Sequence, residues 1–159
     1  MESGPKEALE KLRKYCAYQE RSHADVNQKM WDLKLPMEWR DDIVLALMKE
    51  NFLNEERFAR TYARGKFNIK KWGKVKITEG LKKHEVSKKC IQLALTEIDE
   101  DEYQKVLRQT IEDKRADLKE KNPWKRRSAI YRFALQRGFE SSLIQEEMKR
   151  YEDRSGGRS

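Results

Sequence analysis

Apolar residues recur every three or four positions along almost the whole chain, and charged residues fill the positions between them. The first such stretch runs from about residue 5 to residue 18 and places Ala8, Leu9, Leu12, Tyr15 and Cys16 on one face. This spacing is typical of an amphipathic helix with one buried stripe. Only three prolines and seven glycines occur in 159 residues, so few segments are forced out of a helix. The sequence therefore predicts an all-α protein.

The same pattern separates about nine expected helices, most of which have a recognisable start. Side chains that favour the N-cap stand before four of them, at Ser22, Asn54, Ser87 and Asn122. Acidic residues follow Asn54 and also occupy 99–102, where they suit the positive end of a helix dipole. We expect Pro36 to be the first residue of the third helix and Gly138 to end the eighth in a left-handed conformation.

Composition limits the thickness of the core and the cellular setting. Hydrophobic residues make up 37% and charged residues 40% of the chain, against usual values of about 45–50% and 25%. Such a chain suits thin stacked helical layers better than a thick core. Cys16 and Cys90 lie 74 residues apart, without the spacing of a zinc site or a disulfide framework. The sequence has neither a membrane-length apolar run nor a secretory apolar core, which predicts a cytoplasmic protein that does not contact membranes.

An internal repeat is visible in the spacing of apolar residues. Three of them each stand five positions before another one, in the pairs Met30 and Leu35, Leu81 and Val86, and Ala134 and Phe139. Successive pairs are 51 and 53 residues apart. This period predicts three tandem three-helix repeats at 5–51, 54–98 and 99–151, followed by a disordered tail at 152–159. Because a unit of this size buries its own face poorly, we expect the repeats to stack into an elongated, curved array.

Positive charge is concentrated in the middle of the chain. The net charge is +8, and residues 52–98 alone contribute +7. Eight cations of this segment are candidate contacts for a partner or a nucleic acid: Arg57, Arg60, Arg64, Lys66, Lys70, Lys71, Lys74 and Lys76. A second cluster, Lys125, Arg126 and Arg127, opens a later helix. Many charge runs are only solvated helix faces, but those usually mix both signs. An unbalanced run favours binding to a polyanion or an acidic protein surface.

Catalytic and metal-binding patterns are missing from the sequence. His23 and His84 are the only histidines, both are interpreted as surface residues, and phosphate-loop and zinc-protease motifs do not occur. We therefore predict no catalytic residue, no metal and no cofactor. Trp72 and Trp124 stand at the starts of equivalent helices in the second and third repeats. Such a tryptophan can stack on a base, but the favoured interpretation is a wedge between core layers.

The segment after Asn54 resembles a signature of the RecX regulatory proteins. The resemblance consists of the pair Glu55-Glu56, the run Arg57-Phe58-Ala59, Tyr62, Arg64 and Gly73, and it extends over about residues 6–151. It implies a bacterial cytoplasmic protein that binds RecA recombinase filaments along their groove and suppresses their ATPase, coprotease and strand-exchange activities. Glycine is frequent in this family before the third helix of a repeat. Here Lys34 and Glu85 occupy that place, and only Gly138 fits.

Two functions of different kinds follow from these observations. The first is a non-enzymatic, monomeric regulator that docks on a RecA–DNA filament through its basic row. The alternative is a protein that binds single- or double-stranded DNA directly, independent of sequence. In either case we interpret Phe58, Ala59 and Tyr62 as packing residues, and the cations around them as the functional ones.

Overall fold

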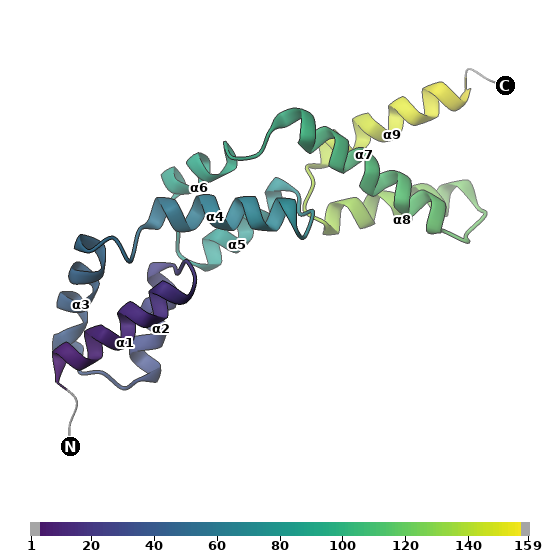
Figure 1. The fold of residues 1–159 in the computed structure, drawn as a ribbon. Helices are drawn as coiled ribbons and strands as arrows, with labels where there is room; N and C mark the ends of the chain where they lie inside the picture. Colours follow the sequence, from purple (N-terminus) through teal and green to yellow (C-terminus); the bar gives the residue numbers. More distant parts are fainter. Residues whose placement is uncertain (1–3, 157–159) are drawn as a thin grey trace. The chain divides into compact units, whose positions relative to one another are not determined.

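The computed structural model describes residues 4–156, with side chains described for residues 4–152. Within residues 4–156 every regular element is a helix, and there are nine of them, so the all-α prediction is confirmed. In chain order they are α1 (Pro5–Tyr18), α2 (His23–Asp32), α3 (Met37–Lys49), α4 (Glu55–Asn68), α5 (Lys74–Lys83), α6 (Lys88–Leu95), α7 (Glu100–Asp117), α8 (Pro123–Gln136) and α9 (Ser141–Gly156) (Figure 1).

The chain folds into two compact units. The first comprises the residues up to Ala63 together with Gly80–Leu95, and the second comprises Arg64–Glu79 together with the residues from Thr96 onward. Helices α4 and α5 therefore contribute to both units, whereas α1–α3 and α6 belong to the first and α7–α9 to the second. Since this division runs through the segment 54–98, it does not test the predicted repeat boundaries.

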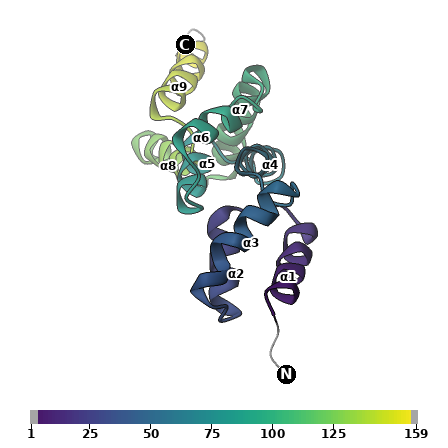
Figure 2. The same cartoon turned by 90° about the vertical axis from the view of Figure 1, so that its left-hand side faces the viewer.

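The core of the first unit forms where α1, α2 and α3 lie side by side (Figures 1 and 2). Each helix turns one apolar stripe toward this core, and the fully or nearly buried residues are Ala8, Leu12, Cys16, Val26, Met30, Ile43 and Leu47. Leu9 and Tyr15 of the predicted α1 face are only partly buried. Helix α2 begins with a complete capping box. The Ser22 hydroxyl accepts the Asp25 amide at 2.9 Å, and the Asp25 carboxylate accepts the Ser22 amide at 2.9 Å.

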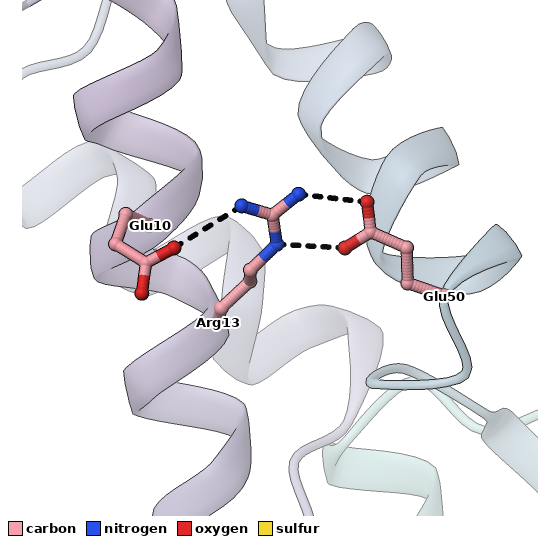
Figure 3. Close-up of polar contacts among 3 residues, drawn as sticks. All are labelled: Glu10, Arg13 and Glu50. Carbon is pink, nitrogen blue, oxygen red and sulfur yellow. Dashed lines mark hydrogen bonds and ion pairs between the residues drawn. The ribbon is translucent and has the colours of Figure 1, made fainter.

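An arginine fork fastens α1 to the end of α3. Arg13 donates through two guanidinium nitrogens to the carboxylate of Glu50, at 2.7 and 2.8 Å, and through the third to Glu10 at 3.1 Å (Figure 3). This paired geometry matches the planar carboxylate and is stronger than a single ion pair. The hydrogen bond from Arg13 lowers the pKa of Glu50.

The second unit is built around α7, against which α8 and α9 pack (Figure 1). Tyr103 and Leu107 of α7, Ala134 of α8 and Phe139 after it are fully buried, as is Ile144 of α9. The ring of Tyr103 lies 5.3 Å from Phe139 and 5.9 Å from Phe67 of α4, centroid to centroid. These aromatic contacts make Tyr103 the centre of this core.

Four helices end in the same hydrogen-bonded turn. After α2, α3, α5 and α8 a residue adopts a left-handed backbone: Lys34 (φ 57°), Asn51 (φ 62°), Glu85 (φ 60°) and Gly138 (φ 96°). The next residue is apolar, and its amide donates five residues back, as from Leu35 to Met30, Val86 to Leu81 and Phe139 to Ala134, at 3.1–3.2 Å. This is the Schellman turn. The repeated spacing of five in the sequence is therefore the distance across this turn.

Three boundaries differ from, or lie beyond, the sequence-based expectations. Pro36 is the N-cap of α3 and not its first helical residue, because its ψ of 141° is extended. Helix α9 continues through Gly156 and so covers residues 152–156 of the predicted tail. The rest of that tail, 157–159, lies outside the described residues.

Candidate functional site

The apolar residues of the signature are packing residues, as interpreted from the sequence. Phe58 and Ala59 are buried in the first unit. Tyr62 is half-buried, with its ring centroid 5.8 Å from that of Phe58 and 5.5 Å from that of His84. A side chain on Gly80 would meet the Tyr62 hydroxyl, since a Cβ placed there lies 2.1 Å from that oxygen. The signature therefore describes how α4 packs on α5 in this unit.

The candidate arginines of the first unit are bonded within the chain. Arg57 donates to the Glu20 carboxylate at 2.7 Å and to the Phe52 carbonyl at 3.3 Å, which ties α4 to the loop after α1. Arg60 donates to Glu56, one turn earlier on α4, at 2.9 Å. Both side chains are about one-third exposed. Arg57 therefore holds α4 against the loop after α1, whereas the Arg60 bond lies within α4. Any partner contact of either arginine has to compete with these bonds.

Two candidates of the second unit are also paired with carboxylates. Arg64 donates to Glu97 at 2.7 Å, and Lys74 donates to Glu100 at 2.5 Å. The Lys74 ammonium also lies 4.7 Å from the centroid of the Tyr103 ring, and its side chain is only 19% exposed. Lys74 therefore contributes to the structure around Tyr103 more than to the open surface.

The turn between α4 and α5 carries two exposed candidate cations. Lys70 and Lys71 are exposed, and neither forms a side-chain ion pair within residues 4–152. Lys66 and Lys76 place their ammonium groups 4.8 and 4.6 Å from the centroid of the Trp72 ring. Each ammonium is attracted to the indole by a cation–π interaction, so Trp72 holds both lysines beside the turn. We call Lys66, Lys70, Lys71, Trp72 and Lys76 the turn cluster.

Backbone contacts with the turn after α8 hold the turn cluster in position. The Gly73 amide donates to the Arg137 carbonyl at 2.7 Å, and the Val75 amide donates to the Gly138 carbonyl at 2.9 Å. A Cβ on Gly73 would lie 2.3 Å from the Gly138 carbonyl group, so only glycine allows this approach. The guanidinium of Arg137 reaches the Lys70 carbonyl at 3.5 Å. Arg137 thus adds a cation that sequence spacing did not indicate, because the approach joins segments 67 residues apart.

A buried phenol links the turn to α9. The Tyr103 hydroxyl accepts the Lys74 amide at 2.8 Å and donates to the carboxylate of Glu140. Burial, followed by the hydrogen bond to Glu140, raises the pKa of Tyr103 far above its ordinary value. The phenol therefore stays neutral and acts as a fixed donor and acceptor, which is a structural role.

In the second predicted cluster, Lys125, Arg126 and Arg127, the two arginines are bonded within the chain and the lysine is exposed. Arg126 donates to the carbonyls of Arg115, Leu118 and Glu120 at 2.8–3.2 Å, so it caps the end of α7. Arg127 is paired with Glu152. Lys125 is exposed. The favoured interpretation of Trp124 as a core wedge is wrong, because this side chain is 78% exposed.

The remaining polar groups serve packing. His84 is half-buried and not a simple surface residue: its Nδ1 lies 3.2 Å from the Ser22 hydroxyl and 3.2 Å from the Asp25 carboxylate. Burial raises the pKa of the Cys16 and Cys90 thiols, which disfavours thiolate chemistry. Within residues 4–152 the structure has no group of His, Cys, Asp or Glu side chains that could hold a metal ion. No described helix is long and apolar enough to cross a membrane.

Comparison with known proteins places the chain in a family. The model of the second three-helix domain of RecX matches residues 54–95, and the model of its third three-helix domain matches residues 100–148. The two matches together cover more than half of the chain. The chain belongs to the RecX family.

Solved RecX structures share the fold of this RecX-family protein. A crystal structure of regulatory protein RecX matches with a TM-score of 0.84 at 19% identity, over 91% of this chain and 73% of that one. The crystal structure of RecX from Lactobacillus salivarius matches with a TM-score of 0.82 at 18% identity, over 92% of this chain and 95% of that one. A search among curated proteins gave no match. At such low identity the solved structures support the three-helix-repeat fold, not individual contact residues.

Proposed function

We propose that this RecX-family chain is a cytoplasmic, monomeric and non-enzymatic regulator that binds RecA recombinase filaments. It inhibits their recombinase, ATPase and coprotease activities in DNA repair and recombination. Family membership supports RecA as the partner, and the exposed pair Lys70 and Lys71 supports the contact surface. These two lysines are exposed, are in no ion pair within residues 4–152 and stand on a turn whose geometry is set by backbone contacts.

The turn cluster is suited to an acidic surface because its charge is available at low cost. A salt-bridged arginine must first leave its partner, whereas an exposed lysine needs only to lose part of its hydration. Rim charges of this kind mainly accelerate association and make it sensitive to salt. For this reason Lys70 and Lys71 are a sharper test than Arg60, whose side chain is bonded to Glu56.

The test adds the purified protein to preformed RecA filaments on single-stranded DNA and follows ATP hydrolysis. We expect wild-type protein to lower the hydrolysis rate at stoichiometric amounts. The variant Lys70→Glu/Lys71→Glu should need a roughly tenfold higher concentration for the same effect, because two attractive contacts become repulsive. No change of hydrolysis by the wild-type protein would refute the proposal.

A matched control uses the same charge change in the first unit. Lys11 and Lys14 lie on the exposed side of α1, so Lys11→Glu/Lys14→Glu alters the net charge equally without touching the turn cluster. We expect it to inhibit like the wild type. Equal weakening by both double variants would mean that net charge, and not the turn cluster, governs binding.

A second candidate function is direct, sequence-independent binding to DNA. The observation that favours it is Trp72, an indole flanked by the ammonium groups of Lys66 and Lys76. Cations and an aromatic ring together suit a nucleic-acid strand. Titrating DNA alone, without the recombinase, separates this function from filament binding. Negligible binding to single- and double-stranded DNA at moderate salt would remove it.

A further inference from the structure

The most exposed large apolar side chain on α8 is an indole. Trp124 is 78% exposed, although it stands at the start of a helix that is capped by Asn122 and packed on α7. A solvent-exposed indole offers a large, flat apolar surface that a partner can cover. The packing of the second unit does not use Trp124, and neither does the turn cluster.

The residues along α8 arrange Trp124 beside a row of cations. Trp124, Ser128 and Tyr131 are spaced i, i+4 and i+7 and share one helix face. Lys125 and Arg132, also seven apart, form the neighbouring row. Trp124 and Tyr131 are therefore separated by roughly 10 Å along the helix axis.

Two grooves meet at Trp124, and both are lined by Ser128 and Tyr131 as well. The first continues to Lys125 and Arg132, and the second continues across α9 to Lys149. The indole of Trp124 therefore lies between the two grooves and lines both of them. The Tyr131 hydroxyl lies 2.5 Å from the hydroxyl of Ser141, and this hydrogen bond ties Tyr131 to the start of α9.

The charges around the grooves favour an anion. Lys125 and Lys149 are exposed and belong to no ion pair within residues 4–152. Of the two lining carboxylates, Glu152 is already paired with Arg127, and Glu120 accepts the backbone amides of Lys121 and Asn122 at 3.0 and 3.3 Å. The four cations that line the two grooves, Lys125, Arg127, Arg132 and Lys149, outnumber these two carboxylates, so the net charge of this face is positive.

We propose that this face of α8 binds single-stranded nucleic acid, with one base stacked on the indole of Trp124 and flanking phosphates held by Lys125 and Arg132 on one side and Lys149 on the other. The inference deepens the second candidate function and rests on it, because it needs contact with nucleic acid. It does not need the recombinase filament.

A single strand fits this face better than other anionic partners. An indole offers a flat surface that a base covers with its own face, whereas the bases of a duplex are already stacked on each other. A membrane surface would need a continuous apolar face, but Ser128, Lys125 and Arg132 surround the indole. An acidic peptide satisfies the cations but leaves the indole uncovered.

The experiment titrates the full chain with a labelled oligothymidine and follows both binding and tryptophan fluorescence. Trp124→Ala should weaken binding by about tenfold, in line with the usual loss when a stacking aromatic is removed. Trp124→Phe should keep most of the affinity, because a phenyl ring still stacks, but should lose most of the fluorescence quenching. A duplex of the same length should quench much less.

The matched control is Trp31→Ala. Trp31 is another exposed tryptophan, 65% exposed, but it lies on α2 in the first unit. This variant should bind the oligonucleotide like the wild type. Unchanged binding by Trp124→Ala would overturn the inference, and so would equal quenching by duplex, by anionic phosphatidylserine vesicles or by a polyglutamate peptide. Filament ATPase inhibition, measured on the same variant, reports on the proposed function separately, since inhibition can persist when oligonucleotide binding is lost.

Discussion

Two residues hold a left-handed backbone where RecX proteins often have glycine. Lys34 and Glu85 have φ values of 57° and 60°, in the turns that follow α2 and α5. For a residue with a Cβ this conformation costs about 1–2 kcal/mol. The surrounding hydrogen bonds enforce it nevertheless, because the apolar residue that follows is anchored five residues back. The departure from the family pattern therefore changes the strain of the turn and not its geometry.

Glycine at position 85 should stabilise the protein. Glu85→Gly removes the left-handed strain and raises the entropy of the unfolded chain, and the difference favours folding by about 0.5–1 kcal/mol. The measurement is the free energy of unfolding in urea. Glu85→Ala removes the same charge but keeps the strain, so it should give no gain. Equal stabilisation by both variants would assign the effect to charge instead.

Acid should destabilise the first unit through Glu55. Burial opposes ionisation of this carboxyl, but hydrogen bonds from Cys90 and Ser87 outweigh it and lower the pKa of Glu55 below its ordinary value of 4.5. The unfolded chain then binds the proton more readily than the folded one. The stabilisation is present above pH 4.5 and is lost as pH falls through the folded-state pKa.

The check is the urea midpoint between neutral pH and about pH 3. Glu55→Gln should show a smaller loss of stability on acidification than the wild type, because position 55 no longer titrates. An identical pH dependence of both proteins would mean that Glu55 does not contribute to it.

At the scale of elements, the turns decide how the helices meet. The turns after α4 and α8 touch backbone to backbone at Gly73 and Gly138, and Tyr103 and Glu140 join the same region by hydrogen bonds. Neither glycine lies in a helix interior, so neither weakens a helix, and both allow the close approach of the two turns. This contact fixes the position of the turn cluster within the second unit.

The contact predicts opposite effects for two glycine substitutions. Gly73→Ala forces the two turns apart, because its Cβ would lie 2.3 Å from backbone atoms that cannot rotate away, and should destabilise the protein by about 2–3 kcal/mol. Gly65→Ala lies within α4 with nothing within 4 Å of its Cβ, so it should stabilise by about 0.5–1 kcal/mol. Urea unfolding measures both, and a neutral Gly73→Ala would show that the turns separate freely.

At the scale of the whole molecule, charge is distributed unevenly along the chain. Residues 52–98 carry +7 of the net +8, but the structure distributes these cations among different roles. Arg57, Arg60 and Arg64 are bonded to carboxylates, whereas Lys70 and Lys71 of the turn cluster are exposed. Other exposed cations of this segment are Lys82, Lys83, Lys88 and Lys89. A protein with this arrangement should bind anionic partners in a salt-dependent way.

The slope of log affinity against log salt concentration depends on how many cations contact phosphate. If the turn cluster contacts DNA, Lys70→Gln/Lys71→Gln should reduce the slope of log affinity against log salt concentration by about 2. Fluorescence anisotropy on a DNA oligomer at several salt concentrations gives this slope. The Lys11→Gln/Lys14→Gln variant should keep the wild-type slope, and a parallel loss in both would argue against a local site.

The sequence by itself determined the helices, their caps and the spacing of the turns. These features depend on interactions within a few residues, such as the Ser22 capping box, the acidic first turn of α4 and the apolar residue that follows each left-handed position. Helical periodicity also identified most buried residues. The family signature could be recognised in the sequence for the same reason, because its residues Phe58 and Ala59 are buried by packing of nearby helices.

Only the tertiary structure decided which cations are open and which are bonded. The carboxylates that pair with Arg57 and Arg64 lie 37 and 33 residues away, and the carbonyls that accept from Arg126 belong to the preceding helix end. The exposure of Trp124 was decided in the same way, because its position on α8 permits either a core or a surface place. A charge run in the sequence counts cations, but long-range contacts determine which of them remain available to a partner.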